Sequence, residues 1–372
     1  MKITLERAAL LKSLSHVQSV VERRNTIPIL ANVLIRAVGQ EVSFVATDME
    51  IEINESVPAQ VTKTGAITAP AHTLYEIVRK LPEGAQVELS SGGTAGQLAL
   101  ASGRSQFKLG CLPVEDFPKM PEGDLKSKFE LGAADLRALI DRTRFAISAE
   151  ETRYYLNGIY LHATKSKKLD VLRAVATDGH RLARVEMAAP EGAMNVAGII
   201  IPRKTVAEVR KLLDETSAPV EIALSESKVR FTFDGIVVTS KLIDGTFPDY
   251  ERVIPSGNDK IMDANPAILS AAVDRVATIS SEKSRAVKMS LSAGQILLSA
   301  NAPEAGSATE EIEVSYEGAL LEIGFNARYL LDILQQIEGE GVRFTLADSA
   351  APALVQDVAD GSALYVLMPM RV

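Results

Sequence analysis

Residues 2–11 read Lys-Ile-Thr-Leu-Glu-Arg-Ala-Ala-Leu-Leu, and the same kind of segment returns twice, at residues 129–140 and 261–269. Each copy has the pattern of a short strand, a turn and an amphipathic helix. A second helical segment also occurs three times in the same order, at residues 69–80, 201–211 and 325–334. Successive copies lie 124–132 residues apart in a chain of 372. A constant period of this kind predicts three repeats of one structural unit, because chance resemblance between amphipathic helices would not keep one order and one spacing.

Between the repeated helices, short alternating segments predict strands. Residues 42–47 and 49–53 alternate apolar and polar side chains, and Asp234-Gly235 is a strong turn pair between strands expected at 229–233 and 236–243. The first helix is expected over residues 8–21. Two helices among many short strands predict an α+β domain whose helices cover one face of its sheets. Segments rich in proline, glycine and charge place three such domains at residues 1–123, 124–256 and 257–372.

The composition narrows the class of protein. Hydrophobic residues make up 47% of the chain, which is enough for three cores, and tryptophan is absent. The single cysteine, Cys111, excludes an internal disulfide framework and is typical of a reducing compartment. The N-terminus carries Glu6 and Arg7 where a secretory signal would be apolar, and no apolar run approaches the roughly 20 residues of a membrane span. We therefore expect a cytoplasmic protein.

The charge distribution indicates a nucleic-acid partner in spite of the net charge of −8. The expected helices together carry a positive charge, and the rest of the chain carries the negative excess. Helices that share one surface would attract phosphate there, while the remaining surface would repel it. The alternative is that these are ordinary solvated helix faces.

Motifs for catalysis, metals and cofactors are sparse. There is no phosphate-binding Gly-x-x-x-x-Gly-Lys-Ser/Thr loop, and the glycine-rich residues 91–96 read as a hairpin turn. The four histidines lack the spacing of metal ligands. Asp178-Gly179-His180 allows a general acid–base pair. A simpler interpretation is that the tight turn is a rigid corner that shapes a surface pocket. We expect no cofactor, no metal and no catalytic residue.

Two further segments favour binding. The tail, Met368-Pro369-Met370-Arg371, is apolar at a place where chains usually fray, so it is expected to be docked. Methionine forms adaptable surfaces for apolar ligands, although simple core filling is an alternative. Arg153-Tyr154-Tyr155 suits contact with sugar-phosphate or exposed bases, and the alternative is aromatic packing at the start of a strand.

These segments, over the whole length of the chain, resemble the bacterial DNA polymerase III beta subunit family, the sliding clamps. The resemblance is carried by residues 24–30, 47–50, 153–158, 176–183, 240–250 and 368–371. It implies a non-catalytic, ring-shaped homodimer joined head to tail, which encircles double-stranded DNA, slides without sequence specificity and tethers the replicative polymerase for processivity. The implied partners are the DNA polymerase III alpha subunit, the clamp loader, other polymerases and mismatch-repair proteins, and the implied location is the nucleoid in the cytoplasm.

The resemblance also assigns three sets of residues. The set that contacts DNA is Arg24, Arg137, Arg153, Tyr154, Tyr155, Arg203 and Lys204. The pocket for a short apolar peptide of the partners comprises Leu156, Thr177, Gly179, His180, Arg181, Leu182, Pro248, Arg252, Val253, Asn326, Tyr329, Val366, Met368, Pro369, Met370 and Arg371. The dimer interface joins Arg104, Gln106 and Phe107 of the first domain to Thr278, Ile279, Glu304, Glu310 and Glu311 of the third. A charged residue in place of Ile279 is expected to give monomers, as the mass in solution would show.

Two other functions remain open at this point. One is an enzyme that uses Asp178 and His180, which loss of an activity on His180→Ala with an intact fold would support. The other is a protein-only scaffold of three repeats, which would fail to hold DNA at all.

Overall fold

The computed structural model describes residues 1–371 except 25, 92–95, 122 and 281–284. Its α-helices follow the predicted repeat, with two in each third of the chain: α1 (Arg7–Val17), α2 (Ala71–Lys80), α3 (Ala133–Arg144), α4 (Arg203–Leu212), α5 (Pro266–Ala277) and α6 (Ala327–Leu334). Strands fill most of the remaining described chain. The protein therefore has the predicted α+β fold of three similar domains.

The chain nevertheless divides into two compact units rather than three. The first consists of Met1–Leu136, Pro190–Val196 and Lys204–Leu242, and the second of Arg137–Ala189, Ala197–Arg203 and Ile243–Val372. The second repeat is thus split between the units. The order of the strands explains the split, because each unit contains one large sheet built from two consecutive repeats.

In the first unit the large sheet has eight antiparallel strands. Their order is β10 (Ser127–Leu131), β15 (Val220–Leu224), β16 (Lys228–Phe233), β17 (Ile236–Lys241), β4 (Ile51–Pro58), β3 (Glu41–Thr47), β2 (Asn32–Val38) and β6 (Gly65–Pro70). A second sheet has the order β5 (Gln60–Lys63), β1 (Lys2–Glu6), β7 (Gln86–Ser90), β8 (Gln97–Ser102) and β9 (Ser105–Gly110). The joint between the two repeats is the pairing of β4 with β17.

In the second unit the large sheet repeats this order. It runs β14 (Ile199–Pro202), β11 (Gly158–Ser166), β12 (Leu169–Thr177), β13 (Arg181–Ala188), β26 (Ala363–Leu367), β25 (Ala353–Asp357), β24 (Val342–Leu346), β18 (Lys260–Ala264) and β22 (Ser315–Tyr316). The smaller sheet runs β21 (Gly306–Glu313), β20 (Gln295–Ala302), β19 (Ala286–Ser292) and β23 (Leu321–Asn326). Here the joint is the pairing of β13 with β26, which corresponds strand for strand to that of β4 with β17.

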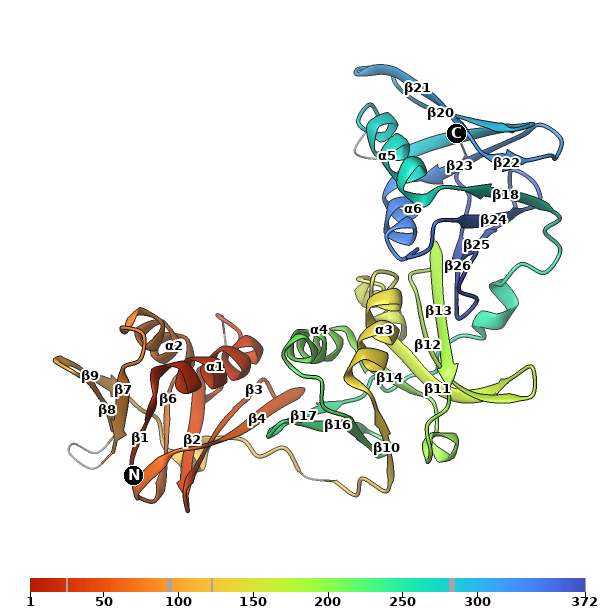
Figure 1. Cartoon of the computed structure of the whole chain (residues 1–372). Helices are drawn as coiled ribbons and strands as arrows, with labels where there is room; N and C mark the ends of the chain where they lie inside the picture. Colours follow the sequence, from red (N-terminus) through yellow and green to blue (C-terminus); the bar gives the residue numbers. More distant parts are fainter. Residues whose placement is uncertain (25, 92–95, 122, 281–284, 372) are drawn as a thin grey trace. The chain divides into compact units, whose positions relative to one another are not determined.

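The helices lie along one side of the strands within each unit (Figure 1). In α1, Leu10, Leu14 and Val17 are fully buried at a spacing of one helical turn, and the helix packs against β3, β4 and α2. In the second unit, α5 packs in the same way against β19, β20, β21 and α6. Among the described residues, no helix combines the length and the apolarity needed to cross a bilayer.

Three boundaries differ from the sequence prediction. The first helix ends as an α-helix at Val17 and continues only as a 3₁₀ turn to Val20. The strand expected from residue 49 begins at Ile51, because Met49 has a φ of 75° inside a tight turn that the Asp48 carboxylate closes. The strand expected to reach residue 243 ends at Lys241. The hairpin expected at 91–96 lies largely outside the described residues.

Candidate functional site

An apolar cluster lies at the joint between β13 and β26 in the second unit. Leu182 pairs with Val366 across the two strands, and both side chains are almost fully buried. Antiparallel neighbours on one face pack against each other, so the joint collects side chains from several strands and a linker. The cluster comprises Leu156, Val175, Leu182, Ile200, Phe247, Tyr250, Leu364 and Val366.

A tight turn borders this cluster where β12 ends and β13 begins. The Asp178 carboxylate accepts the backbone N–H groups of His180 (2.9 Å) and Arg181 (3.0 Å). Gly179 has a φ of 86°, a conformation that favours glycine. The predicted rigid corner is therefore present. Asp178 binds backbone and Arg181, whereas the His180 ring stacks on Tyr329 (6.2 Å between centroids), so these two residues do not form an acid–base pair.

The Arg181 side chain links this turn to α6 and to the backbone just after α3. Its guanidinium donates to Asp178 (3.1 Å), to Asp332 of α6 and to the Phe145 carbonyl, and it lies 4.3 Å from the centroid of the Tyr329 ring. Only 8% of the side chain is exposed. Arg181 is therefore placed to position the turn and Tyr329, and its contact with a peptide stays a prediction.

The C-terminal tail is docked, as predicted. The Met368 N–H donates to the His180 carbonyl (2.9 Å), and the Met370 N–H donates to the Gly324 carbonyl (2.8 Å). The Met368 side chain stays 38% exposed beside the turn. The turn at residues 177–180, the tail at residues 368–370 and the apolar cluster are called the tail site below.

The structure brings most of the predicted pocket residues together at the tail site. Asn326 caps the N-terminus of α6, where its side chain accepts the N–H groups of Arg328 and Tyr329. Pro248, Arg252 and Val253 are exposed on the linker that follows β17, and Arg371 is exposed at the tail. Sequence reasoning missed the cluster members Val175, Ile200, Phe247, Tyr250 and Leu364. The recurrence of Phe117-Pro118 as Phe247-Pro248 was the available signal for one of them.

The residues predicted to contact DNA differ in their present partners. Tyr154 is 54% exposed, and Arg24 and Arg203 are exposed too. Tyr155 is half-buried against Tyr154, and Arg137 is half-buried in α3. Arg153 forms a two-pronged ion pair with Glu150 (2.7 and 2.8 Å). In the first unit, Lys204 binds Asp48 and Glu22. A phosphate at Arg153 or Lys204 would therefore compete with a carboxylate.

The residues predicted for the dimer interface lie on or near two open sheet edges. Phe107 is half-buried on β9, beside the exposed residues Arg104 and Gln106. On the other edge, β21 carries Glu310, which binds Arg275 of α5, and the exposed Glu311. Near β21, Ile279 is half-buried, and Thr278 and Glu304 are exposed.

The chain consists of three copies of one α+β domain, which share sheets and carry an apolar site at one joint. This arrangement defines a multidomain binding protein of the clamp type. The N-terminal, central and C-terminal domains of the DNA polymerase III beta subunit match residues 1–121, 130–249 and 251–371. The curated beta sliding clamps of Caulobacter vibrioides and Escherichia coli are 56% identical over 372 residues and 40% over 373, each with 100% of both chains covered. A sliding clamp structure from Bartonella birtlesii, bound to griselimycin, superposes with a TM-score of 0.98 at 51% identity, with 100% of both chains covered.

The chain therefore belongs to the DNA polymerase III beta subunit family, the beta sliding clamps. Members of this family are processivity factors, which act by binding and not by catalysis. The enzymatic alternative has no support in the geometry of Asp178 and His180.

Proposed function

We propose that two copies of this chain join head to tail in a closed ring around duplex DNA, which slides without sequence specificity and tethers the replicative polymerase. Each copy contributes domains at residues 1–123, 124–256 and 257–372. The observation that carries the proposal is a pair of unpaired sheet edges, β9 in the first unit and β21 in the second. Long open edges are normally covered, because their free N–H and C=O groups bind other strands.

The strand order supports this pairing. Each large sheet has four strands from one domain followed by four from the next, and the sheet of the second unit has the short strand β22 in addition. The order β23-β19-β20-β21 from one chain, followed by β9-β8-β7-β1 from a second, would repeat the same arrangement. A third sheet of the same kind would thus form between chains, and two such contacts would close a ring with two-fold symmetry.

The ladders also give the register of this contact. On β9, Phe107 pairs with Leu100 of β8. The equivalent pairs in the other two domains are Val238 with Phe231 and Tyr365 with Val355. Val238 and Tyr365 are fully buried opposite Ile53 and Ala183 at the two joints, whereas Phe107 is only half-buried. The residue equivalent to Ile53 and Ala183 on β21 is Ala308. Phe107 should therefore lie opposite Ala308 of the second chain, and Gln106 opposite its Thr309.

Charge favours the same contact. Arg104 and Lys108 lie at or on β9, while Glu310 and Glu311 lie on β21 with Glu304 just before it. Opposite charges across an interface assist register and association. Thr278 and Ile279 would complete the contact beside β21.

Cysteine cross-linking tests the dimer and its register. In a Cys111→Ser background, Gln106→Cys combined with Thr309→Cys should give a covalently closed dimer under mild oxidation. The matched control, Gln106→Cys with Glu311→Cys, places the thiols two residues out of register and should cross-link far less. Equal yields from the two pairs, or none, would count against the proposed joint.

Contact with DNA should rest on phosphate and sugar, through Arg24, Arg137, Arg153, Tyr154, Tyr155, Arg203 and Lys204. Contacts of this kind carry no sequence information, which allows sliding. A ring needs only weak attraction because its topology keeps it on DNA. The test is retention after loading on nicked circular plasmid, compared with the same plasmid linearised. Long retention on the circle alone supports the ring, whereas equal retention on both would indicate ordinary electrostatic binding.

The tail site should take short apolar peptides of the DNA polymerase III alpha subunit, the clamp loader, other polymerases and mismatch-repair proteins. The griselimycin complex of the Bartonella birtlesii relative supports a ligand site in the family. The exposed Met368 beside the buried pair Leu182 and Val366 supports an apolar ligand here. Met368→Asp should weaken such peptides at least tenfold without unfolding the chain. The place of action is the nucleoid in the bacterial cytoplasm.

A further inference from the structure

A cavity of about 760 Å³ lies on the large sheet of the first unit, away from every residue assigned above. Its volume is within the range of ordinary ligand sites. The floor comes from β2, β3, β4, β16 and β17, and the linker after β9 closes one side. The lining residues are Leu34, Arg36, Val45, Glu52, Asn54, Val114, Glu115, Phe117, Pro118, Lys119, Met120, Arg230, Val237 and Thr239.

This cavity is built like the tail site of the second unit. Glu52 pairs with Thr239 across β4 and β17, in the same register in which Leu182 pairs with Val366 across β13 and β26. The Lys241 N–H donates to the Glu50 carbonyl (2.9 Å), as the Met368 N–H donates to that of His180 (2.9 Å). Phe117 is buried at the beginning of one linker, as Phe247 is in the other. The two sites are therefore structural equivalents within one chain.

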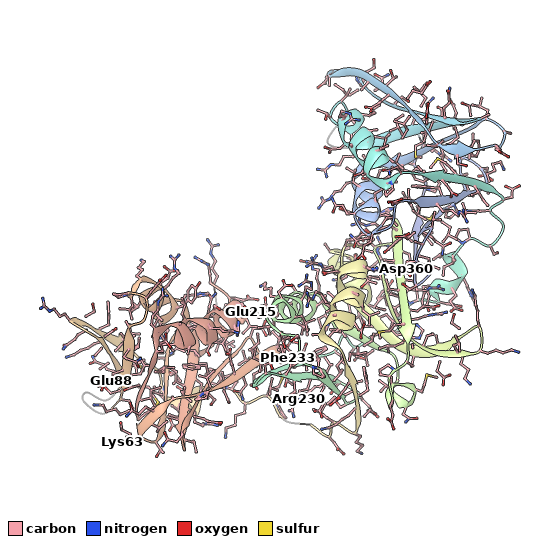
Figure 2. The ribbon with its side chains drawn as sticks, viewed as in Figure 1. Lys63, Glu88, Glu215, Arg230, Phe233 and Asp360 are labelled. Atoms are coloured by element: carbon pink, nitrogen blue, oxygen red, sulfur yellow. The ribbon has the colours of Figure 1, made fainter. Side chains whose placement is uncertain are left out.

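Their side chains differ in a consistent direction. Positions that are apolar at the tail site are polar in the cavity: Glu52 stands for Leu182, and Thr239 stands for Val366. Arg230 of β16 (Figure 2) stands for Leu354 of β25. An apolar floor of Leu34, Val45 and Val237 remains beneath them. A ligand for this cavity must therefore offer both apolar and charged groups.

The ion-pair partners of the lining residues indicate which sign of charge a ligand of this cavity would carry. Glu52 receives a hydrogen bond from the Met120 backbone and lies near Arg230 and Lys228, so its charge is already balanced. Arg36 and Lys119 are exposed at the cavity and make no ion pair with any described residue. Glu115 is exposed at the cavity as well and offsets one of these two cations, so an excess of one positive charge remains there and favours an anionic ligand.

We propose that this cavity is a second peptide site, which binds a short extended segment of a partner protein with acidic side chains flanking apolar ones. The proposal rests on the proposed function only for the idea that the equivalent tail site binds peptides. Arg230 and Arg36 lie four strand spacings apart across the sheet and four residues apart along it, which is about 23 Å between their backbones. An extended segment of about six residues covers roughly 20 Å, and the long arginine side chains span the rest. An acidic side chain at one end would meet Arg36 and Lys119. One at the other end would meet Arg230, because Arg230 and Lys228 together outnumber the single carboxylate of Glu52. The apolar side chains between the ends would cover the floor.

The test uses a capped hexapeptide, Asp-Leu-Ser-Ile-Leu-Asp, and a neutral counterpart with glutamine at both ends. Binding of each to the full chain is measured by calorimetry up to about 1 mM peptide. The variants are Arg36→Glu/Lys119→Glu for the cavity, Met368→Asp for the tail site, and Lys63→Glu/Lys80→Glu as a charge-matched control away from both. Lys63 is exposed on β5 and Lys80 ends α2.

The acidic peptide should bind the parent chain, lose at least tenfold in affinity in the cavity variant, and keep its affinity in the other two. Its binding should also weaken with added salt. Three results would overturn the proposal: no saturable binding, a loss that appears in Met368→Asp instead, or an equal loss in the control. The neutral peptide reports on the tail site separately. Its failure to respond to Met368→Asp would count against the proposed function while leaving the cavity result intact.

Discussion

Replacing Arg181 by methionine tests whether one buried guanidinium holds the tail site together. The change removes the donor to Asp178, Asp332 and the Phe145 carbonyl but keeps an apolar chain of similar length against Tyr329. The side chains of Asp178 and Asp332 are 15% and 26% exposed, so both would lose their cationic partner with little access to water. The turn would lose its link to α6.

The expected magnitude follows from burial. Removing one partner of a buried ion pair costs about 3–5 kcal/mol, because the remaining charge is left uncompensated. The partial exposure of the two carboxylates places Arg181→Met at the lower end, about 3 kcal/mol. The matched control is Arg252→Met. Arg252 binds Asp249 at 2.7 Å, but its side chain is 83% exposed, so the same loss should cost less than about 1 kcal/mol.

Hydrogen exchange measured by mass spectrometry is the suitable assay, because a multidomain chain does not unfold in a single two-state step. A loss of about 3 kcal/mol should speed exchange of β13 and α6 about a hundredfold, with β4 and β17 of the first unit as internal reference. Adding Asp332→Asn should restore part of the loss, about 1–3 kcal/mol of coupling. Exchange unchanged in β13, or raised equally in both units, would refute this account of Arg181.

Three further predictions concern other parts of the chain. His16, 5% exposed, lies between Glu55 (2.7 Å) and Glu215 (3.2 Å), the latter labelled in Figure 2. Burial alone would lower the His16 pKa, but hydrogen bonds and charge from both carboxylates outweigh burial and raise it. Its stabilisation should be complete below about pH 6.5 and lost as pH rises through the higher folded pKa, so His16→Gln should destabilise the first unit at pH 6 and much less at pH 9, as thermal unfolding would show. Gly158→Ala would put a methyl group 2.2 Å from the Ile201 carbonyl and should destabilise the pairing of β11 with β14 by at least about 2 kcal/mol, seen as faster hydrogen exchange there, whereas Gly257→Ala meets no atom within 4 Å and should be nearly neutral. Phe107→Ala should weaken the proposed dimer about thirtyfold by sedimentation, from roughly 1 kcal/mol of lost burial at each of two contacts; an unchanged dissociation constant would exclude Phe107 from the interface.

The sequence predicts those features that depend on neighbouring residues. The repeated helices, the Asp234-Gly235 turn, the rigid turn at Asp178 and the docked tail all follow from local patterns and were all confirmed. The turn at Met49 was missed because alternation at 49–53 imitates a strand that begins two residues later.

Features that depend on distant residues could not be predicted in the same way. Arg181 was assigned to a pocket wall by resemblance, but its partner Asp332 lies 151 residues away, and nothing in either local pattern indicates the pair. The division of each large sheet between two domains also has no local signature, since the pairing of β4 with β17 joins residues 181–189 positions apart. The cavity at Arg36 and Arg230 follows from that pairing and was missed with it.

The sharing of sheets between domains has a mechanical consequence. At each joint inside the chain, five residue pairs of a continuous antiparallel ladder connect one domain to the next, in addition to the covalent linker. Pulling two neighbouring domains apart would require this ladder to rupture, and cutting the linker would not release them. A chain built in this way is stiff at its internal joints. If two chains form a ring, it would therefore open at the contacts between the chains, where no covalent bond joins the two sides.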